Sequence, residues 1–268
     1  MTGRIAVIGL GPGRPDQVTP EAETALAEAQ ELFGYGPYLY RVALRPGQIR
    51  HASDNREELA RAAAALARAA EGASVAVVSG GDPGVFAMAA AVCEAIEAGP
   101  AAWRALDLLV VPGVTAALAL AARIGAPLGH DFCLLSLSDN LKPWETIERR
   151  LVAAAGAGFV IGLYNPISRA RPWQLGRAFA CLAAHLPAET PVVFGRGVGR
   201  DGERVTVTTL AETDPTLADM ATCIIVGSAA TRTIARPGHR PLVYTPRSMP
   251  ETARNTAAAA SSTVAVVP

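Results

Sequence analysis

The chain has 268 residues, half of them hydrophobic, and its 24 Lys and Arg residues balance 24 Asp and Glu residues. A chain of this size holds one large domain or two smaller ones, and its hydrophobic core is large enough for stability without disulfide bonds or structural metals. Its neutral net charge gives no reason to expect a nucleic acid or a membrane surface as partner, and its four cysteines and four histidines lack metal-ligand spacing. We therefore expect a cytoplasmic protein with reduced thiols, no bound metal and no targeting segment.

Short apolar segments alternate with helical patterns along most of the chain. We expect strands at 4–8, 74–78, 107–111, 132–137, 158–164, 191–195, 204–208, 222–226 and 242–244. We expect helices at 20–31, 55–70, 84–98, 115–123, 143–155, 172–185 and 229–235. Alternation of this kind predicts an α/β fold with mixed, mostly parallel sheets covered by helices. An Asp-Gly turn at 201–202 predicts a hairpin in the second half.

Three turns rich in glycine or proline follow expected strands. They are Gly9-Leu10-Gly11-Pro12-Gly13, Ser79-Gly80-Gly81-Asp82-Pro83-Gly84 and Val111-Pro112-Gly113-Val114-Thr115-Ala116-Ala117. Glycine at the end of a strand lets a ligand approach the backbone, and open α/β sheets bind ligands outside the carboxyl ends of their strands. The three turns together predict one long cleft.

A dinucleotide-binding loop is the first alternative, and the first turn departs from its pattern. Gly9 and Gly11 fit, but Arg14 stands where the third glycine belongs. Pro12 removes a backbone donor from the loop. The next helix is expected to begin after Thr19, its N-cap, so no helix N-terminus abuts the glycines. A nicotinamide- or flavin-dependent oxidoreductase therefore remains only as the alternative of a different class.

The segment 125–129, rich in glycine and proline, is a plausible hinge between two α/β domains. We expect an N-terminal domain at 1–115, a C-terminal domain at 116–246 and a flexible tail at 247–268. The tail is mostly Ala, Ser and Thr without a helical apolar period, which favours disorder.

The three turns, in this order, resemble the tetrapyrrole methylases, which use S-adenosylmethionine. Further segments are similar to the branch of that family that methylates C-17 of precorrin-3B in cobalamin biosynthesis. The segments that carry this second likeness are Gly129-His130-Asp131-Phe132, Ser136-Leu137-Ser138-Asp139, Pro143-Trp144-Glu145, Tyr164-Asn165-Pro166-Ile167-Ser168-Arg169-Ala170-Arg171 and Gly227-Ser228-Ala229-Ala230-Thr231-Arg232. The resemblance covers about residues 3–247.

The resemblance implies two α/β domains with a cofactor cleft between them, a homodimer and a tetrapyrrole substrate. It implies S-adenosyl-L-methionine as cofactor and S-adenosyl-L-homocysteine as product. The implied cofactor-binding residues are Pro12, Gly80, Gly81, Asp82, Val85, Thr115, Ala116, Tyr164, Gly197 and Val198. The implied substrate-binding residues are Gly11, Ser136, Ser138, Asn165, Ser168, Arg169 and Arg171.

The reaction of this branch combines methylation at C-17 with contraction of the macrocycle to precorrin-4. Methyl transfer needs positioning of donor and acceptor, whereas contraction also needs an acid and a base. The catalytic candidates are Asp139 and His130. Asp139 has a second interpretation as a helix cap, and His130 as part of a structural pair with Asp131. A related methylase acting at another ring carbon is the alternative within the family.

Basic residues are concentrated in the second half of the chain. Residues 1–168 hold 13 basic and 17 acidic side chains, and residues 169–268 hold 11 and 7. Guanidinium groups bind carboxylates with two parallel hydrogen bonds. Arginines near the ends of expected strands would therefore suit a polycarboxylate such as a precorrin; a solvated basic face is the alternative.

Overall fold

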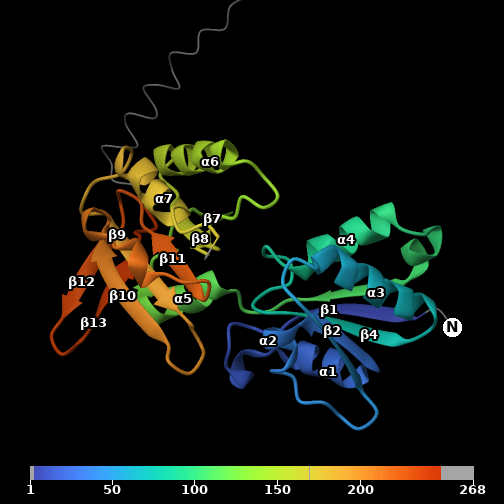
Figure 1. Ribbon diagram of the computed structural model, residues 1–268. Helices are drawn as coiled ribbons and strands as arrows, with labels where there is room; N and C mark the ends of the chain where they lie inside the picture. Colours follow the sequence, from blue (N-terminus) through green and yellow to red (C-terminus); the bar gives the residue numbers. More distant parts are fainter. Residues whose placement is uncertain (1–2, 169, 249–268) are drawn as a thin grey trace, which may run out of the picture. The chain divides into compact units, whose positions relative to one another are not determined.

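The computed structural model describes residues 3–168 and 170–248 (Figure 1). The chain divides into two compact units, with a boundary inside helix α5 (Ala116–Ile124). Unit 1 comprises Met1–Ala119 and Gly197–Glu203, and unit 2 comprises Leu120–Arg196 and Arg204–Pro268. A short segment late in the sequence therefore completes the unit built from the first part of the chain. Most of the expected tail, residues 249–268, lies outside the described residues.

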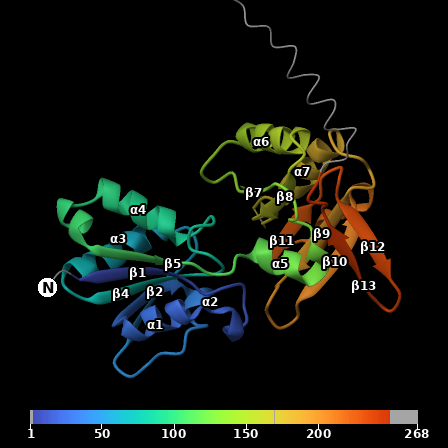
Figure 2. The same ribbon diagram turned by 180° about the vertical axis from the view of Figure 1, so that it is seen from behind.

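Unit 1 contains a fully parallel five-stranded sheet in the order β3-β2-β4-β1-β5. Its strands are β1 (Arg4–Gly9), β2 (Glu31–Tyr35), β3 (Ile49–Ser53), β4 (Ser74–Ser79) and β5 (Asp107–Val111). Its helices are α1 (Pro20–Glu28), α2 (Gly36–Leu39), α3 (Glu58–Ala70) and α4 (Met88–Ala98), with 3-10 turns η1 (Pro15–Gln17) and η2 (Ala101–Ala105). Both views show α3 and α4 on one face and α1 and α2 on the other (Figures 1 and 2).

Unit 1 has two hydrophobic cores, one on each face of its sheet, and alternate residues of the central strands belong to one core or the other. Ile5 and Val7 of β1 pack with α3 and α4, whereas Ala6 and Ile8 pack with α1 and α2. Successive side chains of a strand point to opposite faces, so a strand covered on both sides is apolar throughout. This explains the uninterrupted apolar segment at the start of the chain.

A buried carboxylate links β2, β3 and α3. Glu31, whose side chain is only 5% exposed, accepts hydrogen bonds from Arg68 at 2.5 Å and pairs with His51 at 2.8 Å. The Arg68 hydrogen bonds lower the pKa of Glu31 more than burial raises it, and His51 adds to the lowering. The His51 ring also stacks on Phe33, with 4.2 Å between centroids. This network fixes the edge of the sheet.

Unit 2 contains a mixed five-stranded sheet in the order β10-β9-β11-β8-β7, in which only β7 and β8 run parallel. Its strands are β7 (Phe132–Ser136), β8 (Val160–Tyr164), β9 (Pro191–Arg196), β10 (Arg204–Thr209) and β11 (Thr222–Val226). Helices α6 (Trp144–Gly156) and α7 (Gln174–Ala183) share one apolar core with this sheet, and 3-10 turns η3 (Leu210–Glu212) and η4 (Pro215–Leu217) follow β10. A separate sheet holds β6 (Gly125–Ala126), β12 (Arg232–Arg236) and β13 (His239–Tyr244). The α/β fold class and the hairpin at 201–202 are confirmed.

Several of the expected elements differ from the structure in type or extent. The helix expected at 229–235 is instead strand β12, which pairs with β13 across a turn where Gly238 has a φ of +72°. The helix expected at 84–98 begins only at Met88. The helix expected at 20–31 ends at Glu28, and its last expected residue, Glu31, is the first residue of β2. No helix among the described residues is long and apolar enough to cross a membrane.

Candidate active site

The three turns converge at the carboxyl ends of β4, β1 and β5, which are neighbours in the parallel sheet of unit 1. Gly11 and Gly81 form a two-way backbone bridge, with N–H···O distances of 3.1 and 2.8 Å. Gly81 also lies against the third turn, because a Cβ built on it would be 3.7 Å from the Cα of Thr115. The structure therefore brings together the first, second and third turns, as the sequence predicts.

Close backbone packing explains two glycines in these turns. A Cβ at Gly113 would lie 2.3 Å from the carbonyl oxygen of Gly81, and a Cβ at Gly9 would lie 2.7 Å from the same atom. Gly81 itself has a φ of +72°, which favours glycine. The turns can approach this closely only because Gly9 and Gly113 carry no side chain.

Asp82 ties the second turn to the third. Its Oδ1 accepts a hydrogen bond from the amide of Gly84 at 2.8 Å, and its Oδ2 accepts one from Gly113 at 3.1 Å. Because α4 begins six residues later, Asp82 does not cap that helix. Its carboxylate instead closes a local Asx turn and positions the neighbouring strand-end loop.

The hairpin turn between β9 and β10 completes this region within unit 1. Arg200 donates from Nε to the carbonyl of Pro12 at 3.0 Å, and Arg41 donates from Nη2 to Leu10 and Gly11 at 3.0 and 3.3 Å. Three successive carbonyls of the first turn therefore accept from two guanidinium groups. Burial lowers the pKa of Arg41, and the charge of Arg200 lowers it further.

The remaining implied residues of unit 1 are Gly80, Val85, Ala116, Gly197 and Val198. A Cβ built on Gly80 would lie 2.7 Å from the ring of Tyr38. Val85 donates its amide to Asp82 at 3.4 Å, and Ala116 is the first residue of α5. Gly197 and Val198 are buried in the turn that carries Arg200, and Gly197 has a φ of +58°. All implied cofactor-binding residues except Tyr164 therefore belong to unit 1, as does Gly11.

In unit 2, the loops that follow β7 and β8 interlock at the carboxyl ends of these two strands. Asn165 donates from Nδ2 to Oγ of Ser136 at 3.0 Å, and Leu137 donates its amide to the carbonyl of Tyr164 at 2.9 Å. Asn165 has a φ of +50°, which asparagine tolerates better than most residues. The parallel pairing of β7 and β8 brings the two loops to one edge.

Arg171 is the centre of the polar cluster formed by these loops. Its Nη1 donates to Asp139 at 2.8 Å and also to Asn140, and its Nε donates to Ser168 at 3.3 Å. A longer contact of 3.4 Å joins Nη1 to Ser138. The side chains of Arg171 and Asp139 are only 17% and 25% exposed. Helix α6 begins at Trp144, so Asp139 is not a helix cap, and that interpretation is wrong.

His130 lies at the opposite end of β7 from Asp139. It precedes Phe132, the first residue of the strand, and its Nδ1 is 3.6 Å from Asp131. A strand of this length spans roughly 16 Å. The structure therefore does not bring the two catalytic candidates together.

Sequence reasoning missed two residues of these clusters, Arg41 and Asn140. Arg41 lies after a short helix outside the recognised turns, so no motif marks it. Asn140 directly follows Asp139, and its contact with Arg171 depends on a pairing between two distant loops. Arg169, expected to bind substrate, lies outside the described residues.

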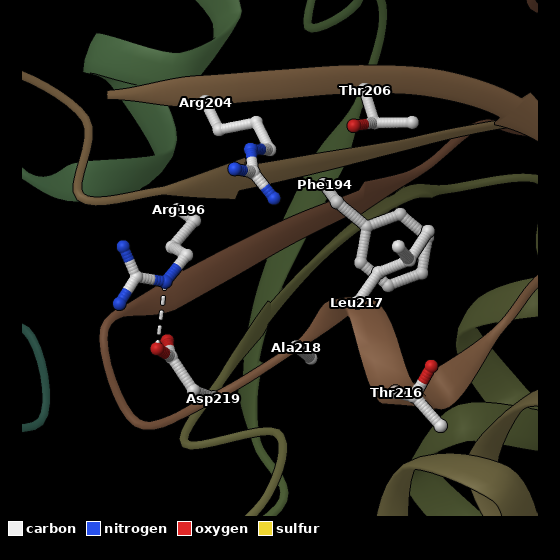
Figure 3. Close-up of a pocket in the computed structure, with 8 residues that line it drawn as sticks. All are labelled: Phe194, Arg196, Arg204, Thr206, Thr216, Leu217, Ala218 and Asp219. Atoms are coloured by element: carbon white, nitrogen blue, oxygen red, sulfur yellow. Dashed lines mark hydrogen bonds and ion pairs between the residues drawn. The ribbon is translucent and has the colours of Figure 1, made fainter. Parts of the chain in front are cut away.

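A small hollow of about 170 Å³ in unit 2 lies apart from these loops (Figure 3). Arg196 and Arg204, which are paired across β9 and β10, both line it. Burial raises the pKa of the Asp219 carboxyl, but hydrogen bonds from Thr222 and from Arg196, the latter at 2.7 Å, contribute to a net lowering. None of the implied site residues lines this hollow. Within the described part of the chain, no group of three His, Cys, Asp or Glu residues could hold a metal ion.

The fold and the loop motifs define a methyltransferase class, and the chain belongs to the tetrapyrrole (corrin/porphyrin) methylases, whose family model matches residues 4–214. The chain is 66% identical over 247 residues to a precorrin-3B C(17)-methyltransferase from a Sinorhizobium species. This alignment covers 92% of the present chain and 97% of that protein.

Two solved structures extend the comparison. The crystal structure of the methyltransferase CobJ has a TM-score of 0.87 and 49% identity, and the match covers 91% of this chain and all of that one. A uroporphyrin-III C-methyltransferase of Thermus thermophilus, solved with S-adenosyl homocysteine, shares the fold, with a TM-score of 0.64, 22% identity and coverage of 85% and 98%.

Proposed function

We propose that this protein transfers a methyl group from S-adenosylmethionine to C-17 of precorrin-3B and contracts the macrocycle to give precorrin-4, a step of cobalamin biosynthesis. The observation that carries the proposal is the 66% identity to a precorrin-3B C(17)-methyltransferase over 97% of its length. Membership of the methylase family favours this activity over the oxidoreductase alternative. The sequence segments that begin at Ser136 and Tyr164 resemble the C-17 branch of the family, which favours C-17 over another ring carbon.

The three turns of unit 1 suit the cofactor. They offer peptide N–H and carbonyl groups on glycine backbone, which a ligand can approach closely. We assign Pro12, Gly80, Gly81, Asp82, Val85, Thr115, Ala116, Gly197 and Val198 to this site, with Tyr164 from unit 2. When bound, the cofactor supplies an already activated methyl group, so these residues act by binding and orienting it and by excluding water.

The polar cluster of unit 2 suits the substrate. Ser136, Ser138, Asn165, Ser168 and Arg171 gather hydroxyl, amide and guanidinium donors on two adjoining loops. Donors of these types recognise carboxylates, and arginine does so with a fixed fork. We assign these residues, with Arg169 and with Gly11 of unit 1, to substrate binding. Arg171 already pairs with Asp139, so it has the further role of holding that carboxylate in place.

Asp139 is the first candidate for proton transfer in the contraction. Its Oδ1 accepts a hydrogen bond from Arg171. We assign its other carboxylate oxygen, Oδ2, to accept or return the proton. His130 is the second candidate, although it lies at the other end of β7.

The proposal is tested by incubating the protein with precorrin-3B and S-adenosylmethionine labelled in its methyl group. We expect a product that has gained one labelled methyl and has a contracted ring, identified by mass and by its visible spectrum. No label in the tetrapyrrole, or label at a carbon other than C-17, would overturn the proposed activity.

Two matched variants then assign the proton transfer. Asp139→Asn keeps the shape of the side chain and should accumulate a methylated product of unchanged ring size. Glu189→Gln is the control, because Glu189 is an exposed carboxylate in the loop before β9 and belongs to neither candidate site. If Asp139→Asn yields the contracted product at the normal rate, the role passes to His130, which His130→Asn then tests.

A further inference from the structure

The hollow of unit 2 is built on one face of the β9–β10 hairpin (Figure 3). Successive side chains of a strand alternate between faces, so Phe194 and Arg196 of β9 lie on the same side of the sheet. Their partners across the hairpin are Thr206 and Arg204 of β10. All four side chains line the hollow, and the rest of its lining comes from η4 and the two residues that follow it.

Arg204 gives the hollow a positive charge that is not offset. Arg196 donates from Nε to Asp219 at 2.7 Å, and the other oxygen of Asp219 accepts from Thr222 at 2.9 Å. The side chain of Arg204 makes no hydrogen bond or ion pair with the residues that the structure describes. Figure 3 shows its guanidinium group directed toward the hollow. Two guanidinium groups therefore face one carboxylate, which is already paired.

The size and lining of the hollow suit a short apolar arm that ends in a carboxylate. Its volume of about 170 Å³ is below the range of about 300–1,000 Å³ that is typical of pockets for whole small molecules. Phe194, Leu217 and Ala218 offer apolar surface for methylene groups. The fork of Arg204 and the hydroxyl of Thr206 are donors of the kind that carboxylates accept.

The hollow lies at the same edge of the unit 2 sheet as the polar cluster around Arg171. Strands β8 and β9 both pair antiparallel with β11, so they run in the same direction. The carboxyl ends of β7, β8 and β9 therefore share one edge with the amino end of β10. The polar cluster follows β7 and β8, whereas the hollow adjoins the end of β9 and the start of β10. Strands β8 and β10 are three strand spacings apart, which is about 14 Å.

We propose that this hollow binds a propionate arm of the tetrapyrrole substrate and that Arg204 holds the carboxylate of that arm. The inference rests on the proposed function and deepens it. The substrate carries carboxylates around its edge, and the separation between the hollow and the polar cluster is comparable to the width of the macrocycle with its arms. One anchor, at Arg171, leaves the macrocycle free to rotate in its own plane. A second anchor, at Arg204, fixes that rotation and so decides which ring carbon is presented for methylation.

The test uses the full chain and measures the Kd for precorrin-3B by calorimetry in the presence of S-adenosylhomocysteine, which prevents turnover. We expect Arg204→Gln to raise this Kd about tenfold, through the loss of a charged hydrogen bond. The Kd for S-adenosylhomocysteine and the melting temperature should not change, because the Arg204 side chain makes no hydrogen bond with described residues. Arg204→Lys should recover part of the affinity, since it keeps the charge but not the fork.

Arg45→Gln is the matched control. Arg45 is an exposed arginine in the segment before β3, in unit 1, and it does not line the hollow. We expect this variant to bind precorrin-3B as the wild type does. An equal loss of affinity in Arg45→Gln and Arg204→Gln would show a general effect of net charge and would overturn the assignment of Arg204.

A double variant tests whether Arg171 and Arg204 hold different arms of the substrate. If they do, the fold-changes in Kd of Arg171→Gln and Arg204→Gln should multiply in the double variant, because distant and independent contacts are additive in free energy. If the double variant binds no more weakly than the weaker single variant, the two arginines act on one carboxylate, and the proposed second anchor is wrong.

The outcomes separate this inference from the proposed function. If the wild-type protein methylates precorrin-3B at C-17, but Arg204→Gln binds precorrin-3B as tightly as the wild type, only the carboxylate site in the hollow fails. If the wild-type protein binds precorrin-3B but transfers no methyl group to it, the proposed function fails. Absence of binding to the wild-type protein overturns both.

Discussion

Replacing Asp82 by asparagine tests how the second and third turns are held together. The carboxylate accepts from Gly84 at 2.8 Å and from Gly113 at 3.1 Å, one hydrogen bond for each oxygen. Asparagine has a single acceptor oxygen, so its amide nitrogen must face one of the two N–H groups. One hydrogen bond to a charged group is lost, at a cost of about 1.5–3 kcal/mol.

Two measurements check this estimate. We expect Asp82→Asn to lower the melting temperature by on the order of 5 °C, since each kcal/mol corresponds to a few degrees in a protein of this size. We also expect at least about tenfold weaker binding of S-adenosylhomocysteine, measured by calorimetry, because the third turn is no longer held in position. Asp131→Asn, at an exposed carboxylate, should change neither value.

The reasoning would be refuted by a folded Asp82→Asn protein with wild-type melting temperature and wild-type cofactor affinity. A lower melting temperature with unchanged affinity would keep the structural role of Asp82 but remove its contribution to the binding site.

Three further predictions follow from particular contacts. Glu31→Gln should destabilise the protein by about 2 kcal/mol at neutral pH. Because the pKa of Glu31 is lowered in the folded state, its contribution is present above the unfolded value of about 4.3, and the difference between variant and wild type should shrink as the pH falls below about 4 in denaturant titrations. Gly81→Ala should cost about 1–2 kcal/mol through its φ of +72° and should also weaken S-adenosylhomocysteine binding; wild-type values in both assays would contradict the placement of the cofactor. Arg171→Gln should weaken precorrin-3B binding and leave cofactor affinity intact, and equal affinity for precorrin-3B would assign Arg171 to loop structure alone.

The sequence predicted best those features that depend on local patterns. Thr19 caps α1 as expected, with its hydroxyl accepting from the amide of Ala22 at 3.1 Å. The first two glycine turns were recognisable because they follow β1 and β4, which are buried on both faces and therefore continuously apolar. The third follows β5, an apolar strand at the edge of the sheet. Their convergence followed from the general rule for parallel sheets, without any knowledge of strand order.

The features that sequence reasoning missed depend on contacts between distant segments. The expected helix at 229–235 is a strand because Thr233 and Ile234 pair with β13, and that partner is not visible in a local pattern. Strand β3 contains the polar residues Arg50 and His51, so its local sequence is typical of a loop. In the structure His51 pairs with Glu31 of the neighbouring strand β2, and this contact is not visible in a local pattern. The interaction of Arg171 with Asp139 spans 32 positions, so spacing alone could not distinguish a carboxylate base from one side of an ion pair.

The turn at Gly197–Glu203 constrains the order in which the protein can mature during synthesis. It belongs to the first unit, yet nearly eighty residues of the second unit precede it along the chain. Until Arg200 has emerged, the carbonyl of Pro12 lacks its donor, and Gly13 lacks the backbone of Gly199 against which it packs. A fragment that ends at residue 119 should therefore build the parallel sheet but leave its first glycine turn loose. A nascent chain can therefore acquire full resistance to proteolysis at the first glycine turn only after residues 197–203 have been synthesised.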